Sequence, residues 1–166
     1  MLALILLSPL FGFLSGCFFG FRLGFGVCLV TTSSIFCAFL SSLVLFFNIV
    51  VSKIVYKINL GKWLSLNLLQ VDWFFCIDSL TVIMLIVVTF ISTLVHIYST
   101  EYMEHDPHLP RFMSYLSLFT FFMLILITAN NFLQLFLGWE GVGLSSYLLI
   151  NFWFTRIQAN KAAIKA

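Results

Sequence analysis

The chain has 166 residues, of which 62% are hydrophobic and 8% are charged, and its net charge at pH 7 is +2. Soluble domains carry about a quarter of their residues as charged side chains, so this composition excludes a water-facing globular protein and indicates an integral membrane protein. The few basic residues form no stripe along any one segment, which argues against a nucleic-acid partner.

Three long apolar segments predict the first three membrane-spanning helices, over residues 2–21, 27–50 and 79–98. Each has at least the roughly 20 residues that cross the hydrocarbon layer. Arg22 and Lys53 follow the first and second segments, and His96 is the only titratable histidine, lysine, arginine or carboxylate within the third.

The connection over residues 53–78 alternates polar and apolar side chains, as in Lys57-Ile58-Asn59-Leu60 and Gln70-Val71-Asp72-Trp73. Alternation with a period of two in two short runs predicts a β-hairpin, lying on the membrane surface. Residues 101–111 are acidic and contain two prolines, which predicts a turn.

Residues 112–154 contain a single charge and are too long for one span. The polar cluster at 128–131 divides them into helices over 112–128 and 132–154. Residues 157–166 form an amphipathic tail. The sequence therefore predicts one all-α membrane domain over residues 1–166, with five transmembrane helices and a surface hairpin between the second and third.

Basic residues predict the orientation of these spans. Three lysines fall on the hairpin side, and five basic residues fall on the opposite side: Arg22, Arg111, Arg156, Lys161 and Lys165. The side with more basic residues is expected to face the matrix or cytoplasm. The N-terminus is then outward and the C-terminus inward.

Glu140 is the strongest candidate functional residue. It lies nine residues after Asn131, or about 13 Å into a hydrocarbon layer of about 30 Å. A charge at that depth costs about 2.5–3.5 kcal/mol on insertion scales, and intramembrane carboxylates commonly mark proton or ion paths. We expect Glu140 to act as a proton relay; the alternative is a protonated carboxyl that hydrogen-bonds a neighbouring helix.

The neighbours of Glu140 indicate close helix packing. Gly138, Gly141, Gly143 and Ser145 are small residues of the kind that let membrane helices approach each other. Tyr147 shares the face of Glu140 at i+7, so it is a candidate for the same polar path, with ordinary packing as the alternative.

Asp78 and His96 are further candidates for a proton path. Asp78 fits the N-cap of the third span, which by itself would account for it. His96 lies near the far end of that helix, where a hydrogen bond at the membrane interface is the alternative. Residues 104–108 carry metal-ligand side chains around a proline, and we expect no metal there. The four cysteines are expected to be small buried thiols without a redox role.

Four segments are similar to subunit five of mitochondrial respiratory complex I, an antiporter-like family. They are FCIDSLT at 75–81, LVHIYS at 94–99, PRFMSY at 110–115 and LGWEGVGLSSYLLI at 137–150. The resemblance implies the N-terminal part of an antiporter-like fold in the mitochondrial inner membrane. It implies that Glu140 belongs to a proton channel that couples NADH:ubiquinone electron transfer to proton pumping.

The family pairs this glutamate with a lysine on a later helix, and no other expected span of this chain contains a lysine. We therefore expect a split subunit, in which a second polypeptide supplies the lysine and the remaining helices and contacts the glycine- and serine-rich face. The tail would lead into a sixth helix. Other antiporter-like and accessory subunits and membrane lipid are further expected partners. No cofactor is expected here, and flavin and iron–sulfur centres would belong to other subunits.

Two other functions remain open at this point. The chain could be a fragment of a multisubunit cation/proton antiporter, which shares the same ancestry. It could also be a structural subunit that the complex needs for assembly, with an inactive channel.

Overall fold

The computed structural model describes residues 1–52, 55–66 and 69–165 of the chain. Six helices and two strands follow one another in these residues: α1 Leu2–Leu23, α2 Gly26–Ser52, β1 Tyr56–Leu66, β2 Leu69–Ile77, α3 Ser79–Tyr102, α4 Leu109–Thr128, α5 Phe132–Ile150 and α6 Ile157–Lys165.

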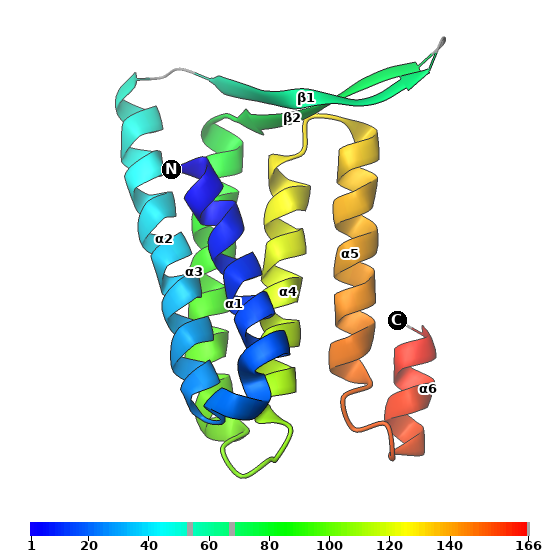
Figure 1. The fold of residues 1–166 in the computed structure, drawn as a ribbon. Coiled ribbons are helices and arrows are strands. Elements are labelled where there is room, and N and C mark those ends of the chain that lie inside the picture. Colours follow the sequence, from blue (N-terminus) through cyan, green and yellow to red (C-terminus); the bar gives the residue numbers. More distant parts are fainter. Residues whose placement is uncertain (53–54, 67–68, 166) are drawn as a thin grey trace.

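The first four helices form a bundle, and α5 extends it on one side (Figure 1). Helix α1 packs against α2 and α4, α2 packs against α3, and α5 packs against α4. The hairpin β1–β2 crosses one end of the bundle, here called the hairpin end. The turns at 24–25, 103–108 and 151–156 lie at the opposite end, here called the loop end.

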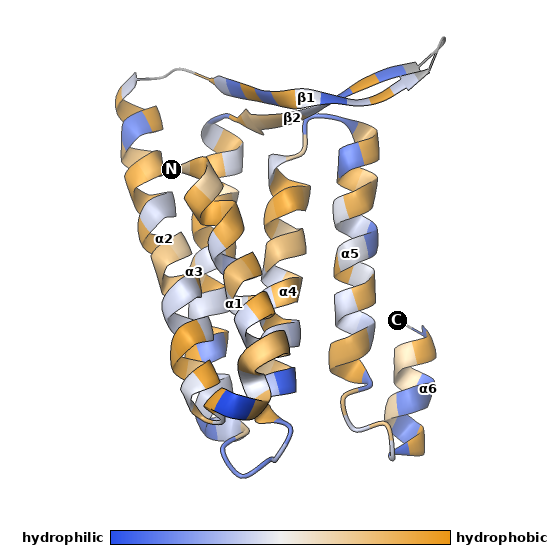
Figure 2. Ribbon diagram, viewed as in Figure 1, coloured by the Kyte–Doolittle hydropathy of each residue, from blue (hydrophilic) through white to orange (hydrophobic). Residues whose placement is uncertain are grey.

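Five helices, α1 to α5, are long and apolar enough to span a membrane. Their outer surfaces carry large apolar side chains, and polar residues gather at the two ends (Figure 2). A helix that is hydrophobic on all sides suits a lipid environment. The prediction of five membrane-spanning helices with a hairpin between the second and third is confirmed, and the chain is a multi-pass membrane protein.

Some helix ends differ from the predicted ones. Helix α3 continues to Tyr102, and α4 begins at Leu109 with Pro110 in its first turn. A proline is tolerated there because the first amides of a helix have no partner within it. The expected turn at 101–111 is thus shorter. Helix α5 stops at Ile150, and the chain turns before α6 folds back beside α5 (Figure 1).

The hairpin is antiparallel, and its register places Tyr56 opposite Ile77 and Lys62 opposite Asp72. Register shifts occur around Gly61, whose φ of 134° is a value that only glycine adopts readily. Trp63 and Trp73 pack edge to face with ring centroids 4.9 Å apart. The predicted strands are confirmed within 56–66 and 69–77, whereas residues 53–54 and 67–68 lie outside the described residues.

The interior of the bundle is lined by hydroxyl side chains. Most of them donate to a carbonyl three or four residues earlier in their own helix, as Thr89 does to Leu85 at 2.7 Å. This pattern satisfies a buried hydroxyl without a partner helix. Ser42 and Thr89 also lie 3.1 Å apart across α2 and α3, which joins these two helices directly.

Candidate functional site

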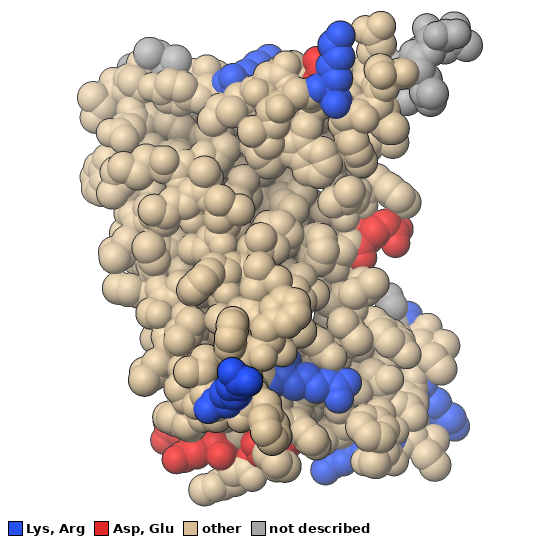
Figure 3. Space-filling view, viewed as in Figure 1, with Lys and Arg blue, Asp and Glu red and all other residues tan. Residues whose placement is uncertain are grey.

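Glu140 lies near the middle of α5, on a face that is exposed in the part of the chain that the structure describes. Six neighbouring exposed positions form this face, here called the open face: Phe136, Trp139, Glu140, Gly143, Leu144 and Tyr147. Only 17% of the most apolar stretch of α5 is buried, against 44% for α4. Figure 3 shows acidic atoms on this side, interrupting the otherwise uncharged middle of the molecule.

The opposite side of α5 packs tightly against α4. A Cβ atom on Gly138 would lie 2.8 Å from the Cα atom of Leu126, and one on Gly141 would overlap the ring of Phe122. Ser145 is fully buried, and its Oγ donates to the Gly141 carbonyl at 2.8 Å. These small residues therefore allow α4 to approach α5 closely.

This packing corrects one expectation from the sequence. The glycine- and serine-rich face was expected to contact a second polypeptide, but Gly138 and Gly141 pack against α4 of the same chain, and Ser145 is buried. Gly143 lies on the open face, where an added Cβ would meet no described atom within 4 Å. The pattern of small residues thus marks the α4 contact, and the open face is the one that carries the carboxylate.

Gln134 is a polar residue that the sequence reasoning missed. It lies on the packed side of α5, one turn before Gly138, and is 1% exposed. Neither amide atom of its side chain has a hydrogen-bond partner among the described residues. Gln134, Gly138, Gly141 and Ser145 recur every three or four residues and so share one face of the helix. That periodicity could have predicted that Gln134 is buried with the small residues.

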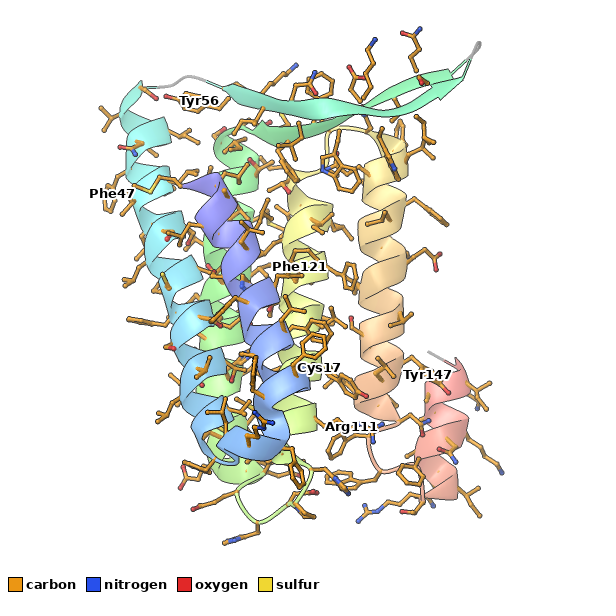
Figure 4. The ribbon with its side chains drawn as sticks, in the orientation of Figure 1. Cys17, Phe47, Tyr56, Arg111, Phe121 and Tyr147 are labelled. Carbon is orange, nitrogen blue, oxygen red and sulfur yellow. The ribbon has the colours of Figure 1, made fainter. Side chains whose placement is uncertain are left out.

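Tyr147 lies on the open face two turns from Glu140, near the loop end of α5 (Figure 4). Its side chain is 42% exposed, so it does not serve as core packing within the described part of the chain. Of the three secondary candidates, Tyr147 is the one that the fold places on the same face as the carboxylate.

His96 lies elsewhere, in the interior between α3 and α4. Its side chain is fully buried. Its Nδ1 atom lies 2.8 Å from the Ser92 carbonyl oxygen, and its Nε2 atom lies 3.3 Å from Ser117 Oγ on α4. His96 therefore hydrogen-bonds inside the protein, to its own helix and to α4, and α3 continues beyond it to Tyr102.

Asp78 occupies the N-cap of α3, as the sequence predicts. Its backbone amide donates to Thr81 Oγ1 at 2.8 Å, and the same hydroxyl donates to the Asp78 carbonyl. One of its carboxylate oxygens is buried without a hydrogen-bond partner in the described residues. Asp78 lies at the hairpin end, at the start of α3, whereas Glu140 lies in the middle of α5.

The cysteines are not uniformly buried. Cys28 is buried, but Cys17 and Cys37 are exposed on the outer surfaces of α1 and α2. The expectation of buried thiols is wrong for these two, because apolar surroundings in a membrane helix include lipid as well as protein. Within the described residues, no group of three or more histidine, cysteine or acidic side chains could hold a metal ion.

Two family models match the chain. Residues 63–113 match the model described as NADH-ubiquinone oxidoreductase (complex I), chain 5 N-terminus, and residues 129–166 match the one described as NADH:quinone oxidoreductase/Mrp antiporter, TM. The second match contains Glu140 and the whole of α5.

Full-length similarity to named relatives decides the family. The chain is 56% identical over 167 aligned residues to NADH-ubiquinone oxidoreductase chain 5 of Phytophthora infestans, and it is also 56% identical to that of Marchantia polymorpha. It is 55% identical to that of Arabidopsis thaliana. The alignments cover 100% of this chain and 25% of each relative. The chain belongs to the complex I chain 5 family. It spans about a quarter of the length of these relatives and corresponds to their N-terminal part.

Proposed function

We propose that the chain is a membrane-arm segment of a proton-translocating NADH:ubiquinone oxidoreductase, in which Glu140 carries the proton. The observation that supports this most strongly is a carboxylate at mid-membrane depth on the open face of α5. An ionised carboxylate facing lipid is costly, so this face requires a polar or charged covering in the assembled protein.

The covering comes from helices outside the present 166 residues. The relatives are about four times as long, since this chain covers 25% of each. The family resemblance assigns Glu140 a lysine on a later helix, which would offset its charge in the low-dielectric layer. That helix belongs either to the same polypeptide or to a second polypeptide. A split subunit is the arrangement in which a second polypeptide supplies it.

A cysteine cross-link tests which polypeptide covers Glu140. Gly143→Cys places a thiol on the open face, one turn from Glu140, where the described residues leave room. We expect a thiol-reactive photocrosslinker attached to this cysteine, such as a benzophenone maleimide, to join it on irradiation to a later helix of a chain 5 polypeptide. Mass spectrometry of the adduct then tells an intramolecular from an intermolecular link, and an adduct with lipid alone would contradict the covering helix.

We place the chain in the mitochondrial inner membrane, with the hairpin end outward. Lys57 and Lys62 lie on the hairpin, whereas Arg22, Arg111 and Arg156 lie at the loop end. The third lysine counted on the hairpin side, Lys53, lies outside the described residues. More basic residues at the loop end favour the matrix for that end. Neighbouring antiporter-like and accessory subunits would then contact this chain, and flavin and iron–sulfur centres would lie in other subunits.

Glu140→Gln in the assembled complex tests the proton-carrying role. Glutamine keeps the size of the side chain but cannot exchange a proton. We expect NADH oxidation to continue and the number of protons pumped per electron to fall. Glu101→Gln, at an exposed position near the end of α3, is the matched control. Unchanged pumping in Glu140→Gln would overturn the proposal and favour a structural subunit with an inactive channel.

A cation/proton antiporter is the second candidate function. Its support is the model matching 129–166, whose description names Mrp antiporters as well as quinone oxidoreductases. Co-migration of the chain with NADH dehydrogenase activity on a native gel separates the two. The antiporter function predicts no such activity and a sodium-dependent pH gradient in vesicles.

A further inference from the structure

A pocket of about 400 Å³ lies between α1 and α4 at the loop end. Both helices contribute to its wall, together with the turn before α4. The lining residues are Gly16, Cys17, Gly20, Phe21, Pro107, His108, Pro110, Arg111, Ser114 and Tyr115. In Figure 4, Cys17 and Arg111 lie at this end of the bundle, and Phe121 lies farther toward the hairpin end.

Two glycines bring the backbones of α1 and α4 together beneath this pocket. A Cβ atom on Gly16 would lie 2.9 Å from Ser114 Cβ, and one on Gly20 would lie 2.9 Å from Pro110 Cβ. Cys17 and Phe21 flank these glycines and are exposed on the outer surface. The pocket is therefore a shallow groove that opens toward the membrane.

One arginine lines this groove: Arg111, in the first turn of α4. Arg22, in the last turn of α1, follows the lining residue Phe21 in the sequence. Arg111 Nε donates to the Tyr115 hydroxyl at 2.9 Å, and the guanidinium carbon lies 5.4 Å from the Tyr115 ring centre. These contacts hold the guanidinium in place while using one of its five N–H donors. The ends of spanning helices lie at the depth of lipid phosphates.

An adjoining pocket of about 320 Å³ carries the opposite charge. It shares Gly20, Phe21, Pro107 and Pro110 with the first and is also lined by Glu104 and Asp106. Asp106 accepts hydrogen bonds from the His108 amide and from Trp153 Nε1, whereas Glu104 is exposed. Figure 3 shows basic side chains above acidic ones at this end of the molecule.

We propose that the two pockets together bind phosphatidylethanolamine. The phosphate lies at Arg111 and Arg22, and the primary ammonium group lies at Glu104. Basic pockets between membrane helices bind lipid headgroups, and carboxylates just beyond the phosphate level disfavour a headgroup with a net negative charge. The exposed apolar surface of α1 beside Cys17, which includes Leu14 and Phe18, receives an acyl chain. This site lies away from the open face of α5 and is independent of the function proposed above.

A photoreactive phosphatidylethanolamine with a diazirine in one acyl chain tests the site. It is exchanged into the purified complex that contains this chain, and the adducts are mapped by peptide mass spectrometry. We expect adducts on residues 12–25 and 107–121. Unlabelled phosphatidylethanolamine should compete more strongly than phosphatidylglycerol, which lacks the amine, or phosphatidylcholine, whose quaternary nitrogen donates no hydrogen bond. Equal competition by all three would overturn the headgroup assignment, and no adducts in these ranges would overturn the site.

Two variants separate the two contacts. Arg111→Gln should lower the adduct yield about fivefold, the effect of one basic residue near a membrane surface. Glu104→Gln should retain binding but abolish the preference for phosphatidylethanolamine over phosphatidylglycerol. Lys161→Gln, an exposed basic residue on α6, is the matched control. If Lys161→Gln lost as many adducts as Arg111→Gln, lipid binding would depend on the overall positive charge of the surface, and the specific site would be overturned. If a variant fails to assemble, the competition series on the unmodified complex still decides the proposal.

Discussion

His96 on α3 and Ser117 on α4 form a buried hydrogen bond between neighbouring helices, with Nε2 and Oγ 3.3 Å apart. The carbonyl of Ser92, 2.8 Å from Nδ1, can only accept, so Nδ1 carries a hydrogen. With Nδ1 protonated, Nε2 of a neutral ring is an acceptor. The single Ser117 hydroxyl hydrogen is then shared between Nε2 at 3.3 Å and the Met113 carbonyl at 3.0 Å. This pair joins α3 to α4 in the interior of the bundle.

Ser117→Ala is expected to destabilise the bundle. It leaves Nε2 of His96 buried without its hydrogen-bond partner, which costs about 1–3 kcal/mol. Thermal unfolding of the purified complex should detect the loss. Ser33→Ala is the control, because the Ser33 hydroxyl is exposed and donates to the carbonyl of Val30 in its own helix. Equal melting temperatures for the two variants would contradict the cross-helix bond.

Gly138→Ala is expected to separate α5 from α4. The added methyl group would lie 2.8 Å from the Leu126 Cα, and a backbone atom cannot move aside as a flexible side chain can. We expect lower yield and lower thermal stability of the assembled complex. Gly143→Ala adds the same methyl group where the described residues leave open space. Its effect should be smaller than that of Gly138→Ala, and the reverse order would show that the closest helix contact of α5 is on its open face.

Asn131→Ala is expected to loosen the hairpin from the bundle. The side chain of Asn131, just before α5, donates from Nδ2 to the Asp72 carbonyl of β2 at 2.7 Å. The loss of one such hydrogen bond costs about 0.5–1.5 kcal/mol. Hydrogen–deuterium exchange should become faster in residues 70–77. Asn48→Ala, at an exposed position on α2, is the control. Unchanged exchange in Asn131→Ala would contradict a role of this hydrogen bond in attaching the hairpin to the bundle.

Asp106→Ala is expected to free the turn after α5 from the turn before α4. Asp106 Oδ2 accepts from Trp153 Nε1 at 3.2 Å, and Oδ1 accepts from the His108 amide at 2.9 Å. Arg156 lies 5.2 Å from the Trp153 ring centre and adds a cation–π contact to the same cluster. Limited proteolysis should reach residues 151–156 sooner in the variant. Glu101→Ala, which removes another carboxylate at this end, should leave the cleavage rate unchanged.

The sequence by itself determined the five spans, the hairpin and the position of Glu140 near the middle of the fifth span. Each depends on local quantities: the length of an uncharged run against the thickness of the membrane, alternation along a strand, and residue count from a polar boundary. For the same reason, Asp78 could be assigned to the N-cap of α3 before the fold was known.

Only the tertiary structure decided which side of each helix meets protein and which is left for lipid or another helix. In a soluble helix, polar residues mark the outer face, but lipid is as apolar as a leucine-rich core, so an apolar helix carries no such mark. The small residues of α5 therefore did not indicate which helix they contact, and only the structure shows α4 packed against Gly138 and Gly141. The same ambiguity concealed the burial of His96 and Gln134. Glu140 was recognisable from its depth alone, but its place on the open face depends on where α4 packs.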